Sequence, residues 1–232
     1  MASRLIASGG HSLVKRRGLY RHAQIHGWKT GLKLNTVLNV ASQSRSVSEV
    51  TKKTASKVES IDFPDEYKVL GADLSLKRPS FCLLSIENED GIAKITDIKF
   101  KTVDNKTKVK PHGMLLDEIF DGFAEIWPYG FTIFAVRETE IMKMKVPSER
   151  SLSKVVGLMD WTLWRHAKSE WYSIYPMTIK KLIAGNGKAE KSEVATALEK
   201  YIGKQDYKCD DESDAAAVAI AWLIQHGQIK EI

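Results

Sequence analysis

Apolar and polar residues follow a strand-like pattern in the stretch that begins at Tyr67. Tyr67–Asp73 and Ser80–Glu87 are short, mainly apolar runs, and Gly91–Val103 alternates apolar and polar residues with the period of two that is typical of a half-buried strand. The turn-forming residues Asn88–Gly91 separate the second run from the third. The pattern therefore predicts three strands that form an antiparallel meander.

Helical periodicity follows the predicted meander. Apolar residues recur every three or four positions in Leu115–Trp127 and in Ser151–Lys168, which predicts two amphipathic helices, with Ser151 as the N-cap of the second. The apolar runs Phe131–Val136 and Trp171–Pro176 predict a fourth and a fifth strand. Three further helices are expected over Met177–Ile183, Ser192–Tyr201 and Ser213–His226. This order predicts an α/β fold in which helices flank a mixed five-stranded sheet.

Charge is distributed unevenly over the 232 residues. Residues 1–48 hold eight of the 35 Lys and Arg residues and no Asp or Glu, so the other 27 basic residues face 29 acidic ones. We therefore divide the chain into a basic N-terminal extension, 1–57, and a folded domain, 58–232. Three roles for the extension stay open: a DNA-binding arm or small helical module, an organelle transit segment, or a tail without a partner.

Composition argues against several classes of protein. No apolar run approaches the roughly 20 residues of a membrane-spanning helix, so we expect a soluble intracellular chain with no membrane partner. Its location would be the cytoplasm, or a mitochondrion or other organelle if 1–57 is a transit segment. Cys82 and Cys209 match no zinc-binding pattern and are expected to be free thiols. The glycines beside Asn186 lack the Gly-Lys-Ser/Thr of a phosphate loop, which argues against nucleotide hydrolysis and a small-molecule cofactor.

Four acidic residues stand where the predicted fold would bring them together. Asp73 follows the first strand, Glu138 ends the fourth, and Asp211 and Asp214 share one face at the start of the last helix. Each alone has a simpler explanation as a turn or capping residue. Together, clustered carboxylates repel one another unless cations neutralise them, and oxygen ligands suit Mg²⁺, with Mn²⁺ as a substitute. The set predicts a two-metal site that hydrolyses phosphodiesters.

A resemblance to a known family supports this interpretation. The acids in Gly71-Ala-Asp-Leu-Ser75, at Glu138 and in Asp211–Ala219 match the acid pattern of RuvC-type Holliday junction resolvases, and Ile179–Val194 resembles the family stretch VKxxxxGxGxAxKxxV. The resemblance covers about Tyr67–His226. It implies an RNase H-like fold, a homodimer and metal-dependent nicking of two opposed strands at a four-way junction. The long extension is typical of a bacteriophage or organellar member.

The resemblance also implies the metal ligands, which are expected to be Asp73, Glu138, Asp211 and Asp214. The family often has Ile-Glu at the end of the fourth strand, where this chain has Val-Arg-Glu, so Glu140 stays open as the alternative to Glu138. A second departure is Ser75, which stands where the family usually has glycine.

Basic residues near these acids are expected to contact DNA. Lys180 and Lys191 match family lysines that contact or position the DNA phosphates, and Lys191 is assigned to the catalytic set with the four acids. The loop after Glu138 adds Lys143, Lys145 and Arg150, either as DNA contacts or as a solvated loop.

The aromatic residues Trp161, Trp164, Trp171 and Tyr172 could stack on bases, but the fold core or a dimer interface is the preferred interpretation. In the resembling family, the matching helix lies at the dimer interface.

The expected function is a structure-selective endonuclease that resolves Holliday junctions and other branched DNA, in recombination, genome segregation or debranching. One alternative is an RNase H-like ribonuclease that cuts RNA–DNA hybrids, against which the family lysines argue. The other is a branched-DNA-binding protein without activity, against which the four acids argue, because idle clustered carboxylates would only destabilise the fold.

Overall fold

The computed structural model describes residues 61–89, 91–105, 110–139 and 147–229, without the side chains of 147–149. The chain divides into two units, Met1–Lys53 and Thr54–Ile232, and every described residue belongs to the second. The predictions for the extension 1–57, and those for Glu140, Lys143 and Lys145, therefore lie outside the described residues.

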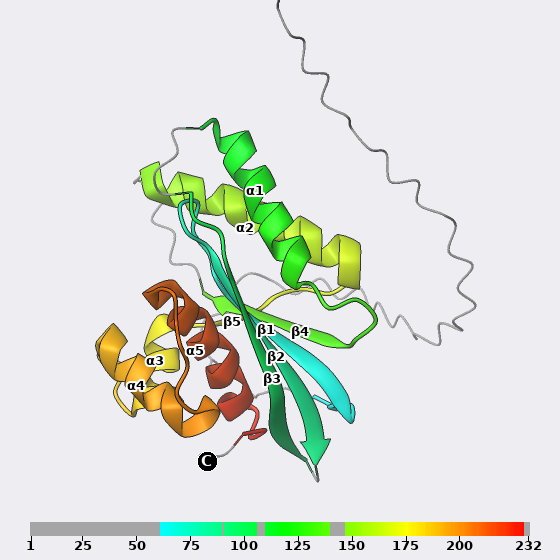
Figure 1. Ribbon diagram of the computed structural model, residues 1–232, viewed down its shortest axis with the longest axis vertical. Helices are drawn as coiled ribbons and strands as arrows, with labels where there is room; N and C mark the ends of the chain where they lie inside the picture. Colours follow the sequence, from blue (N-terminus) through cyan, green and yellow to red (C-terminus); the bar gives the residue numbers. More distant parts are fainter. Residues whose placement is uncertain (1–60, 90, 106–109, 140–146, 230–232) are drawn as a thin grey trace, which may run out of the picture. The chain divides into compact units, whose positions relative to one another are not determined.

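A mixed five-stranded sheet forms the centre of the fold, in the order β3-β2-β1-β4-β5 (Figure 1). β1 (Glu66–Asp73), β2 (Ser80–Glu89) and β3 (Ile92–Thr102) are antiparallel neighbours, which confirms the predicted meander. β4 (Ile133–Glu138) runs parallel to β1 on its other side, and β5 (Tyr172–Ile174) runs parallel to β4 at the edge. The strands confirm the predicted α/β fold with a mixed sheet.

Helices cover both faces of this sheet (Figure 1). α1 (His112–Ile126) and α2 (Pro147–Ala167) pack on one face. α3 (Pro176–Ala184), α4 (Lys191–Ile202) and α5 (Asp210–Gln225) pack on the other. Each face buries its own apolar core, so the sheet is covered on both sides, as its long apolar strands require.

Side chains of β1 alternate between the two cores. Leu70 and Ala72 pack towards α1 and α2, whereas Tyr67 and Val69 pack towards α5. Since neighbouring residues of a strand point to opposite faces, Asp73 at the end of β1 faces the side of α5. The strand pattern thus determines on which side of the sheet a site at Asp73 can form.

α1, α2 and α5 begin three or four residues earlier than the pattern predicted. α2 begins at Pro147, so Ser151 is not its N-cap and Arg150 lies in the first turn of a helix rather than in a loop. Proline suits a first helical turn, because the N–H that it lacks would have no partner inside the helix. α5 begins at Asp210, three residues before the predicted Ser213. The acidic stretch is therefore part of the helix itself.

β1 and α5 approach each other closely at Gly71. A Cβ at this position would stand 2.9 Å from the Cβ of Ala219 and would collide with the backbone carbonyl of Ala215. The side chains of α5 from Ala215 to Leu223 are all buried, so this helix lies inside the fold rather than on its surface. The contact at Gly71 places the start of α5 next to Asp73, two residues further along β1.

The structure also tests two expectations from composition. Cys82 and Cys209 are both free, as predicted. Among the described residues, no helix is both long enough and apolar enough to cross a membrane.

Candidate active site

β1, β4 and α5 bring four acidic side chains to one end of the sheet. β1 and β4 run parallel and end side by side at Asp73 and Glu138, and α5 begins next to them with Asp211 and Asp214 in its first turns. Carboxylate oxygens of Asp73, Asp211 and Asp214 lie within 4.8 Å of one another. Glu138 lies outside this group of three, but its charge acts on Asp73. The fold thus assembles the four acids that the sequence singled out.

A hollow of about 210 Å³ opens at this end of the sheet. Its walls come from the ends of β1 and β4, from α2 and from the start of α3. The lining residues are Asp73, Leu74, Arg137, Glu138, Thr139, Leu152 and Pro176. Two of the four acids therefore face a shared cavity, with helices from both sides of the sheet forming its edges.

The four acids are close together and only partly exposed to solvent. Burial raises the pKa of Asp73 to about 7, and the carboxylates of Asp214, Glu138 and Asp211 add to that increase, while Lys191 opposes it. A divalent cation would relieve both the desolvation and the repulsion, since an opposite charge favours the ionised carboxylate. A set of carboxylate oxygens is also the ligand set that hard cations such as Mg²⁺ prefer. The residues fit a divalent cation.

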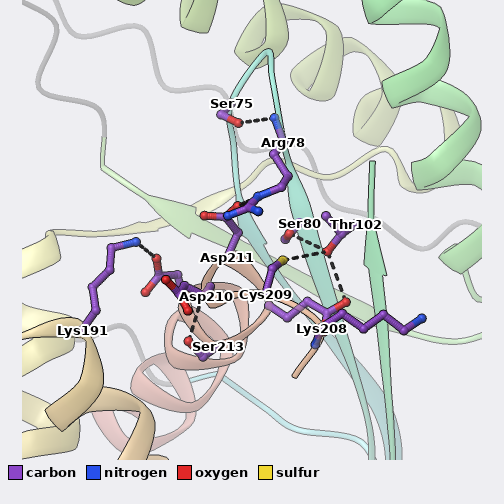
Figure 2. Close-up of polar contacts among 12 residues, drawn as sticks. Ser75, Arg78, Ser80, Thr102, Lys191, Lys208, Cys209, Asp210, Asp211 and Ser213 are labelled. Carbon is purple, nitrogen blue, oxygen red and sulfur yellow. Dashed lines mark hydrogen bonds and ion pairs between the residues drawn. The ribbon is translucent and has the colours of Figure 1, made fainter. Parts of the chain in front are cut away.

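Two basic side chains partly neutralise the acids (Figure 2). Arg78, in the connection between β1 and β2, donates a hydrogen bond from Nε to Asp211. Lys191, the first residue of α4, donates from Nζ to Asp214. Burial alone would lower the pKa of Lys191, but the hydrogen bond and charge of Asp214 raise the pKa above its ordinary value. Both cations are therefore held in their charged form.

Lys180 supports the site through the backbone. Its Nζ donates to the carbonyl of Ala189 at 2.7 Å, which ties α3 to the loop that leads into Lys191. Burial and then the charge of Asp214 raise the pKa of Glu138, and the charges of Lys191 and Lys180 oppose this increase. Lys180 thus holds the loop in place, and its positive charge favours the ionised form of Glu138.

The start of α4 explains how Lys191 reaches the acids. Glu190 is the N-cap of α4 and forms a capping box with Glu193, in which the Glu190 backbone N–H donates to the Glu193 carboxylate at 2.7 Å. In the preceding loop, a Cβ at Gly187 would stand 2.7 Å from Cγ of Met177. The glycine-rich stretch therefore packs closely against α3 and aims the first residue of α4 at the acid cluster.

A hydrogen-bond network anchors the start of α5 to β3 (Figure 2). Glu212 is 2% exposed, and its carboxylate accepts from Oγ1 of Thr102 at 3.2 Å and from the backbone N–H of Lys208 at 2.8 Å. Oγ1 of Thr102 also lies 2.7 Å from Oγ of Ser80 in the neighbouring strand. Because Glu212 directly follows Asp211, this anchor also fixes the position of the acid cluster.

Sequence reasoning did not identify Arg78 or Glu212. The signal for Arg78 was a basic residue five positions after Asp73, in a short connection between two strands. Glu212 offered no signal, because it is one acid among several in Asp210–Asp214.

Arg150, the other predicted basic residue in the described part of the chain, does not join the acids. Arg150 is exposed in the first turn of α2, and no contact of its side chain with the four acids lies within the described part of the chain. Lys143 and Lys145 fall outside that part.

Two tryptophans of α2 are exposed. Trp161 is 56% and Trp164 is 53% exposed, so of the two preferred interpretations, fold core or dimer interface, these two side chains do not fit the core. They lie three residues apart and therefore share one helix face. Trp171, in contrast, is half-buried, and its Nε1 donates to the carbonyl of Met159 at 3.1 Å. The exposed pair leaves an intermolecular contact or base stacking as the remaining interpretations.

The sheet order, with acids at the ends of β1 and β4 and on α5, defines the RNase H-like class of folds. Within this class, the model of one family, crossover junction endodeoxyribonuclease RuvC, matches residues 69–222. The chain belongs to the RuvC family.

Individual relatives are similar over shorter stretches. The RuvC of Synechocystis sp. is 29% identical over 90 residues, which are 37% of this chain and 51% of the relative. The RuvC of Sulfurovum sp. is 41% identical over 54 residues, 23% of this chain and 34% of the relative. The chain thus spans about half the length of the first relative and about a third of the second.

Solved structures show the same fold. T. thermophilus RuvC in complex with Holliday junction substrate superposes with a TM-score of 0.53 at 18% identity, over 72% of this chain and 99% of that chain. Thermus thermophilus RuvC alone gives a TM-score of 0.51 at 18% identity, over 71% and 99%. At 18% sequence identity, these similarities show that the fold is shared.

Proposed function

We propose that this protein is a metal-dependent endonuclease that cuts branched DNA, above all four-way junctions. The observation that carries the proposal is the group of carboxylates at the ends of β1 and β4 and the start of α5, which is suited to a divalent cation. Membership of the RuvC family supports DNA as the substrate. The similarity in fold to a T. thermophilus RuvC bound to Holliday junction substrate supports branched DNA in particular.

In this proposal, Asp73, Glu138, Asp211 and Asp214 hold Mg²⁺, for which Mn²⁺ can substitute, and four carboxylates suffice for two ions. When bound, the ions supply activation of the attacking water and stabilisation of the leaving oxygen. Asp73, whose pKa is about 7, releases its proton when a cation binds. Lys191 orients Asp214 and carries the positive charge that a phosphate in the site requires.

DNA binding extends beyond the acids. We assign Lys180 and Lys191 to the neighbourhood of the cleaved phosphate, and Lys143, Lys145 and Arg150 to DNA contacts near the branch point. The domain 58–232 is the nuclease, and the basic extension 1–57 adds positive charge that suits a polyanion.

A homodimer would provide two active sites for the two opposed strands of a junction. Trp161 and Trp164 are exposed on one face of α2, on the side of the sheet opposite α4 and α5. Exposed aromatic pairs of this kind are enriched at protein interfaces. We therefore place the dimer contact on this face of α2.

Cleavage of a labelled synthetic four-way junction in Mg²⁺ tests the proposal. The wild type is expected to make paired nicks at the junction and to leave a linear duplex and an RNA–DNA hybrid uncut. Asp73→Asn and Asp211→Asn are expected to bind the junction but to cut it at least about a hundredfold more slowly, as happens when one transition-state-stabilising group is lost. The matched control is Asp121→Asn, an exposed acid on α1.

The same assay decides the fourth ligand and the alternatives. Glu138→Gln is expected to abolish cutting, whereas Glu140→Gln is expected to cut like the wild type; the reverse result would assign Glu140. Junction binding without cutting in Mg²⁺ and in Mn²⁺ would indicate a binding protein. Preferential cutting of the hybrid would indicate a ribonuclease.

A further inference from the structure

Arg78 brings a positive charge to the acid cluster from the connection between β1 and β2. Its Nε donates to Oδ2 of Asp211 (Figure 2). The Arg78 side chain is 23% exposed and that of Asp211 is 18% exposed, so the pair lies at the open edge of the site. A guanidinium has five N–H donors, and Nε supplies only one of them. Within the described residues, no hydrogen bond from the two terminal nitrogens of Arg78 accompanies the bond from Nε.

The connection that carries this arginine is fixed at several points. The arginine's own backbone N–H donates to Oγ of Ser75 at 2.9 Å. The carbonyl of Lys77 accepts from the backbone of Asn105 at 2.8 Å, and that of Pro79 accepts from the backbone of Val103 at 3.0 Å. Residues on both sides of the arginine are thus bound to the segment after β3. The guanidinium therefore projects from a rigid base rather than from a free loop.

The Arg78 guanidinium is positively charged throughout the physiological pH range. A guanidinium that pairs with a carboxylate through Nε still presents the planar fork of its terminal nitrogens. That fork matches two oxygens of a phosphate, which a lysine ammonium cannot match in the same way.

We propose that Arg78 is a phosphate-binding residue of the active site, which holds Asp211 through Nε and binds a DNA phosphate next to the cleaved bond through its terminal nitrogens. This inference rests on the proposed function, since it takes DNA as the substrate. One side chain would then fix both a carboxylate of the acid cluster and the substrate phosphate. Arg78 would then link the position of the phosphate directly to that of Asp211, and a residue without the guanidinium would lose this link.

The test compares Arg78→Gln and Arg78→Lys with the wild type. The matched control is Lys94→Gln, which removes the same charge from an exposed side chain. Lys94 lies near the start of β3, whereas the connection that carries Arg78 is bonded to the segment after the end of this strand. Thermal melting checks that each variant is folded. Junction affinity is then measured in EDTA at several salt concentrations, Mg²⁺ affinity without DNA by calorimetry, and cutting rates in saturating Mg²⁺.

Three results are expected for Arg78→Gln. The slope of log affinity against log salt becomes shallower by about 1, because one phosphate contact is lost. Mg²⁺ binds about threefold to tenfold more tightly without DNA, because a neighbouring positive charge is gone. The rate of cutting at saturating junction falls by about a hundredfold, in the range for one lost transition-state contact. Lys94→Gln changes none of the three.

Arg78→Lys separates charge from geometry. It is expected to keep the salt slope, because it keeps the charge, but to cut at least about tenfold more slowly, because the fork is lost. If Arg78→Gln does not fold, Arg78→Lys alone tests the inference. An unchanged cutting rate in Arg78→Lys would then overturn the phosphate-binding role of Arg78.

Failure of the inference and failure of the proposed function give different results. If the wild type cuts and Arg78→Gln keeps its rate and its salt slope, the phosphate role of Arg78 is wrong while the nuclease stands. If the wild type cuts no junction in Mg²⁺ or Mn²⁺, the proposed function is wrong. The salt dependence of junction binding by Arg78→Gln then still shows whether Arg78 contacts a DNA phosphate, because binding is measured without metal.

Discussion

The backbone carbonyl of Ala215 lies so close to Gly71 that no side chain fits between β1 and α5 at this point. Asp73 follows Gly71 by two residues, and Asp214 directly precedes Ala215. The close approach of the two backbones therefore determines the separation of two acids in the candidate site. A larger residue at position 71 would push these acids apart.

Replacing Gly71 with alanine is expected to destabilise the fold by about 1–3 kcal/mol, the usual effect of overpacking a core. The cutting rate is expected to fall as well, since α5 must move away from β1. Urea denaturation measures the stability. Gly113→Ala in α1 is the control, because a Cβ there meets nothing within 4 Å. Equal denaturation midpoints for both variants would mean that α5 can move away from β1 without a loss of stability.

The stability of the metal-free protein is expected to fall as the pH rises from about 4 to about 7. The pKa of Asp73 is 3.8 in its ordinary state and about 7 in the fold, mainly because of burial. In this window, the folded protein holds a proton that the unfolded chain has already released, so raising the pH favours unfolding. Asp73→Asn removes the part of this dependence that comes from Asp73.

Urea denaturation in EDTA at pH 4.5, 6 and 8 measures this effect. The stability advantage of Asp73→Asn over the wild type is expected to grow with each step in pH, by a few kcal/mol in all. Asp121→Asn, at an exposed position, is expected to give no such trend. A constant difference between Asp73→Asn and the wild type would contradict the raised pKa of Asp73.

Mg²⁺ is expected to stabilise the folded chain, since only the fold assembles the four acids. At a concentration 100 times its dissociation constant, the ion adds about 2.7 kcal/mol. The measurement is the shift of the melting temperature on addition of Mg²⁺ at pH 8, with NaCl of equal ionic strength as the control. Asp214→Asn is expected to lose most of this shift, and a full shift in this variant would place the ion elsewhere.

Glu212→Ala is expected to lower stability by about 1–3 kcal/mol, because the Thr102 hydroxyl and the Lys208 backbone N–H lose the acceptor that the buried Glu212 carboxylate supplies. The cutting rate is expected to fall too, since the start of α5 loses its anchor to β3. Glu212→Gln, which keeps the shape and one acceptor oxygen, should retain most of the stability. Asp210→Ala, at the exposed neighbouring acid, is the control in both assays.

Trp161→Glu and Trp164→Glu are expected to convert a dimer into monomers without unfolding them. Exposed tryptophans at an interface centre contribute about 2 kcal/mol or more to association, so one charge there weakens the dimer at least about thirtyfold. Light scattering after size exclusion measures the mass. Thr196→Glu, on the exposed face of α4 across the sheet, should remain dimeric. A monomeric wild type would refute the dimer.

The sequence predicted the strands and the four acids because both follow from local rules. Alternation along β1 reports which side chains are buried, and a strand end fixes where Asp73 and Glu138 must stand. The start of α2 was predicted too late because its basic residues suggested a loop. Pro147 was the available signal for a helix start.

Long-range partners could not be predicted in this way. Glu212 pairs with Thr102, 110 residues away in the chain, and Arg78 pairs with Asp211 at a separation of 133 residues. A charged residue in a sequence is most often solvated, and only the folded chain reveals which carboxylate is buried and which cation it meets.

The division of the acids between β1 and α5 has a consequence for biosynthesis. A nascent chain still attached to the ribosome at any point before Asp210 contains only Asp73 and Glu138 of the four carboxylates. α5 must then enter the centre of the fold before Asp211 and Asp214 reach them. An unfinished polypeptide therefore lacks two of the four proposed metal ligands. Under the proposed function, cutting of DNA would begin only once the whole domain has folded.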